Sequence, residues 1–141
     1  MTKPRDPHHN DRLAVLRETM VSLVRGETPD LSARQMAVFL TCYVRDGAHT
    51  VRGLAQALNV SKPAITRALD RLAALGLALR KEDPMDRRSV LVQRTPKGAA
   101  YLRRLRQIMR CADHEGDGRD HPTHGLVALG MGGTLGMLQA G

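Results

Sequence analysis

Residues 61–72 read SKPAITRALDRL, and they predict a helix whose two sides differ in chemistry. Ile65, Leu69 and Leu72 are spaced four and three residues apart, so they share one side of a helix with about 3.6 residues per turn. Ser61 is a suitable N-cap because its hydroxyl accepts a hydrogen bond from an orphan amide of the first turn. The other side carries Lys62, Thr66, Arg67 and Arg71. The stretch therefore predicts a helix with one buried face and one basic, exposed face.

A second, shorter helix is predicted just before this one. Thr50 can cap a helix over residues 51–58, in which Leu54, Ala55 and Leu58 face inward. Asn59 follows, and asparagine tolerates the positive φ that a tight turn needs. A helix, a turn of a few residues and a second helix form the architecture of a helix-turn-helix.

A β-hairpin is predicted to follow the helix-turn-helix. Gly76 is a typical terminator for the preceding helix. Residues 77–81 alternate weakly between apolar and other side chains, and residues 89–93 are a β-branched run. Residues 82–88 lie between them as a charged, turn-rich tip. The predicted fold is therefore mainly α with a small β-hairpin, a winged helix-turn-helix.

Further helices are predicted on both sides of this unit. Asp11 can cap an amphipathic helix that ends at Gly26. A Ser-x-x-Gln capping box at residues 32–35 starts another helix. Thr95, followed by proline, caps a last helix that runs to about Arg110. The first and last of these helices are candidates for dimerisation.

The chain of 141 residues is long enough for one domain and too short for two ordinary ones. We expect a flexible N-terminal arm over residues 1–10 and a winged helix-turn-helix domain with flanking dimerisation helices over residues 11–110. Eight of the 13 glycines lie in residues 111–141. No helical or strand period fits that stretch, so we expect a disordered Gly/His-rich tail.

The charge is uneven along the chain. The net charge is +8, and 21 of the 22 basic residues lie at or before Arg110. A basic body indicates a polyanionic partner, because Lys and Arg displace counterions from phosphates. Charge alone leaves DNA, RNA and a membrane surface open. Aromatic residues make up only 2% of the chain, which leaves few stacking platforms for single strands and favours duplex DNA.

Other classes of protein are disfavoured by the sequence. Two cysteines and the lack of a signal sequence predict a cytoplasmic protein, and no apolar run is long enough for a membrane span. No Ser/His/Asp order, nucleophile elbow or phosphate-cradling glycine loop is present, so neither an enzyme nor a cofactor site is predicted. Cys42 lies on a predicted buried helix, where a packing role is commoner than a reactive thiolate.

The basic helix has the residue types that read DNA in a major groove. Arg67 can donate two hydrogen bonds to guanine, and Thr66 can contact a thymine methyl group or a polar base edge. Ser61 and Lys62 can hold phosphate. The predicted contacts of this recognition helix are Ser61, Lys62, Pro63, Thr66, Arg67 and Arg71. An ordinary surface helix with solvated charges is the plainer interpretation of the helix taken alone.

The tip of the hairpin carries Asp86, Arg87 and Arg88. An arginine here can enter the narrow, electronegative minor groove, and Asp86 can orient a guanidinium through a bidentate ion pair. The alternative is a solvated charged turn, in which salt bridges contribute about 0–1 kcal/mol.

Several of these segments together resemble a known family. Residues 72–77 read LAALGL and residues 83–90 read DPMDRRSV, accompanied by Arg80, Thr95 and Gly98. This pattern resembles the MarR (multiple antibiotic resistance regulator) family of winged helix-turn-helix transcription factors, over about residues 31–110. The resemblance implies a prokaryotic DNA-binding regulator, usually a homodimer on a palindromic operator and often a repressor.

The resemblance also implies roles for particular residues. Asp86 and Arg88 match the family's Asp-x-Arg pair, with Arg88 in the minor groove and Asp86 as its orienting partner. The stretch that matches the family's reading helix comprises Ser61, Lys62, Pro63, Thr66 and Arg67. Release by a small phenolic or lipophilic effector, or by cysteine oxidation, is common in such proteins.

Two alternatives remain beside a DNA-binding regulator. A winged helix can serve as a protein-interaction module, which should expose an apolar patch where a DNA reader exposes its basic face. A metal-binding role would use Cys111, His114, Glu115, His121 and His124, but none of these has the spacing of a strong metal motif. We therefore predict no metal site.

Overall fold

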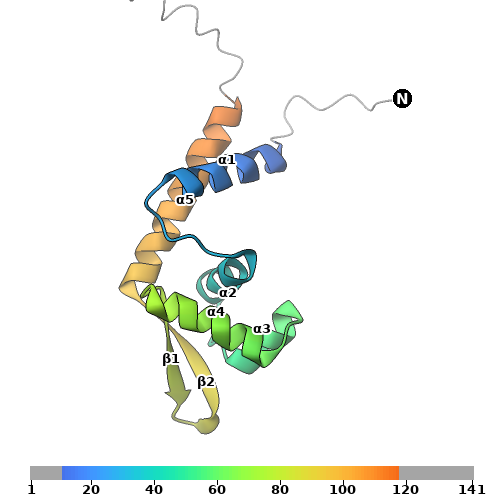
Figure 1. The fold of residues 1–141 in the computed structure, drawn as a ribbon, viewed down its shortest axis with the longest axis vertical. Helices are drawn as coiled ribbons and strands as arrows, with labels where there is room; N and C mark the ends of the chain where they lie inside the picture. Colours follow the sequence, from blue (N-terminus) through green and yellow to red (C-terminus); the bar gives the residue numbers. More distant parts are fainter. Residues whose placement is uncertain (1–10, 118–141) are drawn as a thin grey trace, which may run out of the picture.

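The computed structural model of the protein describes residues 11–117. Five helices and one antiparallel hairpin follow one another along the chain (Figure 1). They are α1 (Arg12–Arg25), α2 (Ala33–Val44), α3 (Val51–Leu58), α4 (Lys62–Ala74), β1 (Ala78–Asp83), β2 (Asp86–Arg94) and α5 (Pro96–Asp117). This confirms the predicted fold, which is mainly helical with a two-stranded wing.

The helices begin where the sequence places a capping side chain. Asp11 accepts a hydrogen bond from the amide of Leu13 at 3.1 Å, and the capping box between Ser32 and Gln35 is complete. The Thr50 hydroxyl accepts from the amide of Gly53 at 2.9 Å. Each cap satisfies an amide that the helix itself leaves unpaired, so local sequence determines where these helices start.

The core lies where α2, α3, α4 and the first turns of α5 meet. Ile65, Leu69 and Leu72 are almost fully buried, which confirms the predicted inward face of α4. Phe39 on α2 stacks on Tyr43 at 4.4 Å between ring centroids and meets Tyr101 of α5 edge to face at 5.1 Å. One continuous cluster therefore holds α4 against α2 and leaves the other side of α4 in solvent.

The wing is longer than the sequence predicted. β1 reaches Asp83 and β2 begins at Asp86, so only Pro84 and Met85 form the turn between them. The ladder continues through charged residues because both faces of this part of the hairpin lie in solvent, where the strand needs no apolar side chain. A hydrogen bond of 2.8 Å from the amide of Val92 to the carbonyl of His49 ties β2 to the start of α3. The wing is thus anchored to the helix-turn-helix.

A buried polar joint connects α5 to the body. The Tyr43 hydroxyl donates to the carbonyl of Leu77 at 2.6 Å and accepts from the amide of Thr95 at 2.9 Å. The Thr95 hydroxyl donates to the carbonyl of Gly76 at 2.6 Å and accepts from the amide of Gly98 at 2.9 Å. A Cβ at position 98 would overlap the Tyr43 hydroxyl, so this close approach requires glycine.

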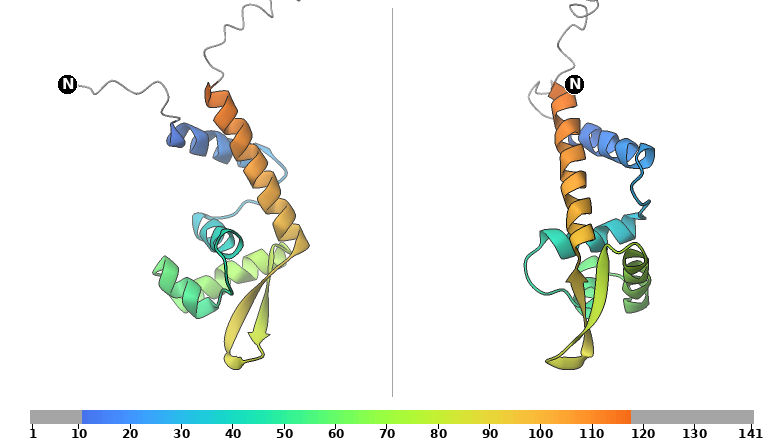
Figure 2. Two further views of the ribbon diagram at one scale, coloured as in Figure 1. Left: turned by 180° about the vertical axis from the view of Figure 1, so that it is seen from behind. Right: turned by 90° about the vertical axis from the view of Figure 1, so that its left-hand side faces the viewer.

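The last helix extends further than expected. Figure 2 shows α5 running away from the hairpin, with α1 packed beside it. The helix passes Arg110 and ends at Asp117, which corrects the predicted end. Its buried side continues from Leu105 to Ala112, a residue too small to mark the period in the sequence. The expected arm over residues 1–10 and most of the expected tail lie outside the described residues.

Within residues 11–117 no helix combines the length and the apolar character that crossing a membrane requires.

Candidate nucleic-acid interface

The turn between α3 and α4 fixes the direction of the recognition helix. Asn59 has φ 51° and ψ 49°, the left-handed conformation predicted for it, and the amide of Val60 donates to the carbonyl of Ala55 at 3.1 Å. Ser61 then has an extended backbone, and its hydroxyl accepts from the amide of Ala64 at 3.3 Å. The chain therefore leaves α3 and starts α4 within a few residues, which places the last turn of α3 next to the first turn of α4.

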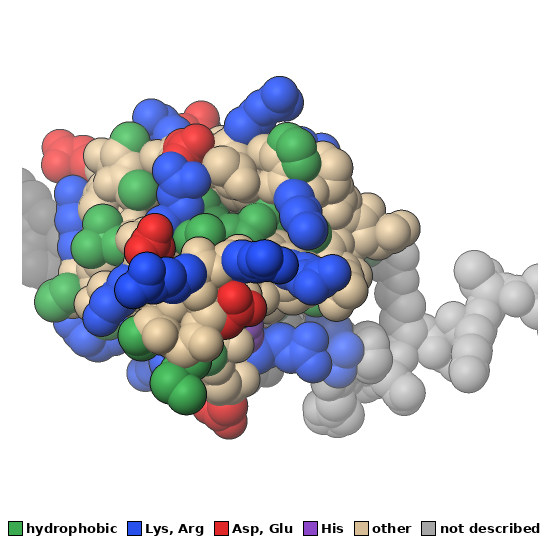
Figure 3. Space-filling model, turned by 90° about the horizontal axis from the view of Figure 1, so that it is seen from below, with side chains coloured by type: hydrophobic (Ala, Val, Ile, Leu, Met, Phe, Trp, Pro, Cys, Tyr) green, Lys and Arg blue, Asp and Glu red, His purple; other side chains and the backbone are tan. Residues whose placement is uncertain are grey.

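A hollow of about 700 Å³ lies between α3, α4 and the wing. Three separate parts of the chain supply its charged and polar walls. The residues that carry this chemistry are Arg52, Lys62, Thr66, Arg80, Asp86 and Arg88. Lys and Arg side chains are spread over this end of the molecule, with a few carboxylates among them (Figure 3). The walls hold four cationic side chains and one carboxylate, which suits a polyanion.

The structure brings together some of the predicted DNA-contacting residues and spreads out others. Lys62 and Thr66 from α4 share the hollow with Asp86 and Arg88 from the wing. The remaining predicted residues are exposed but do not line it; they are Ser61, Pro63, Arg67, Arg71 and Arg87. A helix that inserts into a groove needs such outward residues on its free side, so their exposure is compatible with base contact.

Asp86 does not hold Arg88 in the way the sequence suggested. Its Oδ1 atom accepts from the backbone amide of Arg88 at 3.1 Å, and its Oδ2 atom accepts from the hydroxyl of Ser89 at 3.1 Å. In the part of the chain that the structure describes, the carboxylate makes no ion pair with the Arg88 guanidinium, which corrects the expected bidentate pair. Asp86 instead shapes the backbone of the turn, because an aspartate side chain readily bonds amides two residues on.

Sequence reasoning missed two residues of the hollow, Arg52 and Arg80. Arg52 is exposed in the first turn of α3. Since Leu54 and Ala55 form the predicted buried face of this helix, the same pattern could have shown that Arg52 faces solvent. Arg80 lies on β1, and its Nη2 atom is 2.5 Å from Oδ1 of Asp70 on α4. That ion pair joins strand and helix across ten positions of the chain, so no local pattern revealed it.

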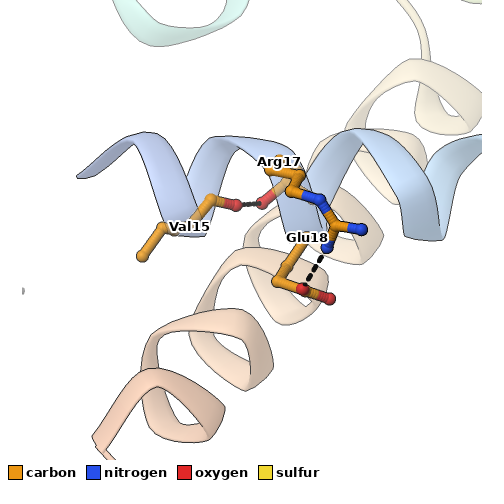
Figure 4. A network of polar contacts seen from close by, with 4 residues as sticks. Val15, Arg17 and Glu18 are labelled. Carbon is orange, nitrogen blue, oxygen red and sulfur yellow. Dashed lines mark hydrogen bonds and ion pairs between the residues drawn. The ribbon is translucent and has the colours of Figure 1, made fainter. Parts of the chain in front are cut away.

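An apolar groove of about 640 Å³ lies at the other end of the molecule, between α1, α2 and α5. Its apolar walls come from Leu16, Met20, Leu23, Met36, Leu105 and Met109. Leu13 and Val24 of α1 are also about three-quarters exposed. Figure 4 shows α1 next to α5, with Arg17 paired to Glu18 at 2.7 Å. The helices predicted to dimerise therefore carry a large apolar surface.

The thiol of Cys42 is only 2% exposed, and burial raises its pKa from 9.0 to about 11. The nearby Arg94 opposes this shift only in part, and its Nε atom donates to the Cys42 carbonyl at 2.8 Å. A buried thiol with a raised pKa is a poor nucleophile, and this agrees with the packing role expected for Cys42.

Within residues 11–117 no three His, Cys, Asp or Glu side chains gather as a metal site would require. His121 and His124, which were weighed as ligands, lie outside the described residues.

The fold and the basic face define a winged helix-turn-helix protein. Residues 30–89 match the MarR family. The multiple antibiotic resistance protein MarR of Salmonella typhimurium is 40% identical over 79 residues, which are 55% of this chain and 54% of that protein. A cysteine-to-serine mutant of MarR from Escherichia coli, solved as a crystal structure, is 30% identical with a TM-score of 0.58, over 86% of this chain and 83% of that one.

The transcriptional repressor CouR, solved bound to a 23-mer DNA duplex, shares the fold. Its TM-score is 0.60 and its identity 24%, over 92% of this chain and 84% of that one. The protein belongs to the MarR family of winged helix-turn-helix regulators, a family of transcription regulators rather than enzymes. The chain spans about half the length of the curated MarR relatives it matches.

Proposed function

We propose that this protein binds double-stranded DNA in a sequence-specific manner and acts as a transcriptional repressor. The observation that carries the proposal is the hollow between the recognition helix and the wing, with Lys62 and Thr66 on one wall and Arg88 on the other. The basic recognition helix and the basic wing, with the hollow between them, match a duplex, whose two grooves are separated by a charged sugar-phosphate strand. Binding to duplex DNA is also consistent with the cytoplasmic location that we propose for this protein.

The recognition helix is suited to the major groove. Its apolar side is anchored in the core, so its orientation does not depend on DNA. Its exposed side presents Thr66 and Arg67 on adjacent positions near the start of the helix. An arginine there can bond two acceptors of guanine, while Ser61 and Lys62 hold the strand. We expect Arg67 to read a base and Arg71 to contact phosphate.

The wing is suited to the adjacent minor groove. Arg87 and Arg88 follow a turn of two residues and are exposed. The Asp86 carboxylate fixes the backbone amide of Arg88, which limits the directions that the arginine side chain can take. A narrow minor groove concentrates negative potential and attracts arginine. Arg88 is therefore the proposed minor-groove residue. Arg87 is proposed to contact the DNA backbone beside that groove.

A homodimer completes this proposal. The exposed apolar side chains of α1 outside the groove, Leu13 and Val24, form a surface that a second copy can cover. Two copies related by a twofold axis place two recognition helices on a palindromic operator. The same groove between α1, α2 and α5 suits a small lipophilic effector, since its walls are almost entirely apolar.

A protein-interaction module is the second candidate, and the surface chemistry disfavours it. Among the described residues, the large exposed hydrophobic side chains of the wing are Leu79 and Met85, and α3 and α4 have none. A module that docks proteins through this end would need a contiguous apolar patch, whereas here the exposed side of α4 is basic. DNA fits this face better.

Selection of bound sequences from a random duplex pool tests the proposal. We expect enrichment of a palindrome, because a dimer presents the same reading helix twice. Enrichment of a single half-site would retain DNA reading and contradict the dimer. Failure to enrich any sequence at modest salt would contradict specific DNA binding and favour the interaction module.

A further inference from the structure

The recognition helix carries one acidic residue on its exposed side. Asp70 is 51% exposed in its side chain and lies among the basic residues Lys62, Arg67 and Arg71 of α4. A carboxylate beside DNA repels phosphates, so its position calls for a physical reason. Its partner supplies that reason: Oδ1 of Asp70 is 2.5 Å from Nη2 of Arg80, which lies on β1 and is 41% exposed.

Arg80 also lines the hollow between helix and wing. A guanidinium has five N–H donors, and the ion pair with Asp70 uses the Nη2 end of Arg80, so donors remain for a second anion. The planar fork suits a carboxylate on one side and a phosphate on the other. The ion pair holds this fork in one place, whereas an unpaired arginine must lose rotamer entropy on binding.

Arg52 stands on another wall of the same hollow. It lies in the first turn of α3, where the positive end of the helix dipole disfavours a cation. The dipole of α3 therefore gives no reason for a cation at this position. The amides at the start of α3 and the Arg52 side chain both attract an anion that enters the hollow.

The hollow lies between the surface proposed to enter the major groove and the surface proposed to enter the minor groove. The sugar-phosphate strand that separates these two grooves must then pass through it. We propose that Arg52 and Arg80 are phosphate ligands for this strand, and that Asp70 is a positioning residue that holds Arg80 toward it. The inference rests on the proposed DNA binding and names residues that neither the sequence motif nor the fold comparison assigns.

Removal of the Asp70 charge tests the positioning role through the sign of its effect. If Asp70 only repels DNA, the Asp70→Asn variant loses a negative charge and binds duplex more tightly. If Asp70 positions Arg80, the same variant binds roughly three- to tenfold more weakly, because the arginine is no longer held. Glu82→Gln is the matched control: Glu82 lies two residues from Arg80 on the same face of β1, and its loss should leave binding equal or tighter.

The phosphate contacts are tested by the salt dependence of duplex binding. We expect Arg52→Gln and Arg80→Gln each to lower the magnitude of the slope of log K against log salt by about 0.9, equally on all sequences. Arg106→Gln should leave the slope unchanged, because Arg106 is exposed in the middle of α5, a helix that runs away from the hairpin (Figure 2). Arg80→Lys keeps the charge and should keep the slope, while its affinity falls with the loss of the fork.

The outcomes separate this inference from the function on which it rests. A wild-type chain that binds no duplex overturns both. If the wild type binds duplex and the salt slopes of Arg52→Gln and Arg80→Gln are unchanged, only the proposed phosphate contacts of Arg52 and Arg80 are overturned. Tighter binding by Asp70→Asn, matching Glu82→Gln, overturns the positioning role of Asp70. Thermal unfolding of each variant checks that it is folded, and these exposed substitutions should leave the melting temperature close to that of the wild type.

Discussion

Replacing Gly98 by alanine tests the joint that connects α5 to the DNA-binding body. Gly98 lies in the first turn of α5, where alanine ordinarily stabilises a helix by about 0.5–1 kcal/mol relative to glycine. Here a Cβ would overlap both the Tyr43 hydroxyl and the carbonyl oxygen of Leu77. The tertiary contact therefore reverses the sign that helix propensity predicts.

The size of the effect follows from what the Cβ displaces. The Tyr43 hydroxyl donates a buried hydrogen bond to the Leu77 carbonyl at 2.6 Å and accepts a partly buried one from the Thr95 amide at 2.9 Å. Each contributes about 0.5–1.5 kcal/mol, and overpacking costs about 1–3 kcal/mol more. After the helix gain of about 0.5–1 kcal/mol is subtracted, Gly98→Ala should lower the free energy of unfolding by about 1–5 kcal/mol, a large share of the stability of a small domain.

Denaturant unfolding followed by circular dichroism measures this change, with Gly53→Ala as the control. Gly53 is also in the first turn of a helix, but its added Cβ would meet a single side-chain atom, Oγ1 of Thr50, at 3.1 Å. We expect Gly53→Ala to change stability by less than about 1 kcal/mol. The two alanine variants should thus differ in midpoint although both sit near a helix start.

A midpoint that rises in Gly98→Ala would refute the reasoning. Tyr43→Phe provides a second check, because it removes the hydroxyl that the Cβ overlaps. Alone, Tyr43→Phe should destabilise the protein by about 1–3 kcal/mol, since Leu77 and Thr95 lose a partner. In the Gly98→Ala background it should cost less, and strictly additive effects would show that the two residues do not meet in this way.

Three further predictions concern the DNA contacts of the recognition helix and the wing, the buried thiol of Cys42, and the turn between α3 and α4. Arg67→Ala should reduce discrimination at one operator position by about 1–3 kcal/mol, whereas Arg88→Ala should weaken binding alike on many sequences; affinities for a panel of single-base operator variants check both. Because burial raises the pKa of Cys42 to about 11, the thiol's contribution to stability should be complete below about pH 9 and lost as the pH rises through 11. Denaturation at several pH values should show this loss in wild type and not in Cys42→Ala. Asn59→Gly should be tolerated and Asn59→Val should destabilise the protein, because φ is 51° there; thermal unfolding distinguishes them.

Much of the fold follows from short patterns. The caps at Asp11, Ser32, Thr50 and Ser61 lie where the sequence predicted them, and the left-handed turn is at Asn59. Each of these depends on residues a few positions apart, so the chain carries the information locally. The ends of the wing strands and of α5 were misplaced because charged or small residues continue these elements without a hydrophobic period.

The candidate site was predictable only in part. Lys62, Thr66 and Arg88 were found from the recognition helix and the wing, and the structure places all three around one hollow. The role of Asp86 was wrong in detail, because its carboxylate bonds the Arg88 amide and the Ser89 hydroxyl instead of a guanidinium. The donor from which an exposed aspartate accepts a hydrogen bond depends on the geometry of the turn, and the sequence does not specify that geometry.

The sequence by itself determined the helices, their caps, the basic side of α4 and the class of fold, because periodicity and capping act between near neighbours. Only the tertiary structure decided that Arg52 and Arg80 join the hollow, since α3, α4 and β1 are brought together by a shared core. It also decided that Asp70 of α4 pairs with Arg80 of β1. The helix that SKPAITRALDRL predicts is therefore one wall of a site whose other walls come from α3 and the wing.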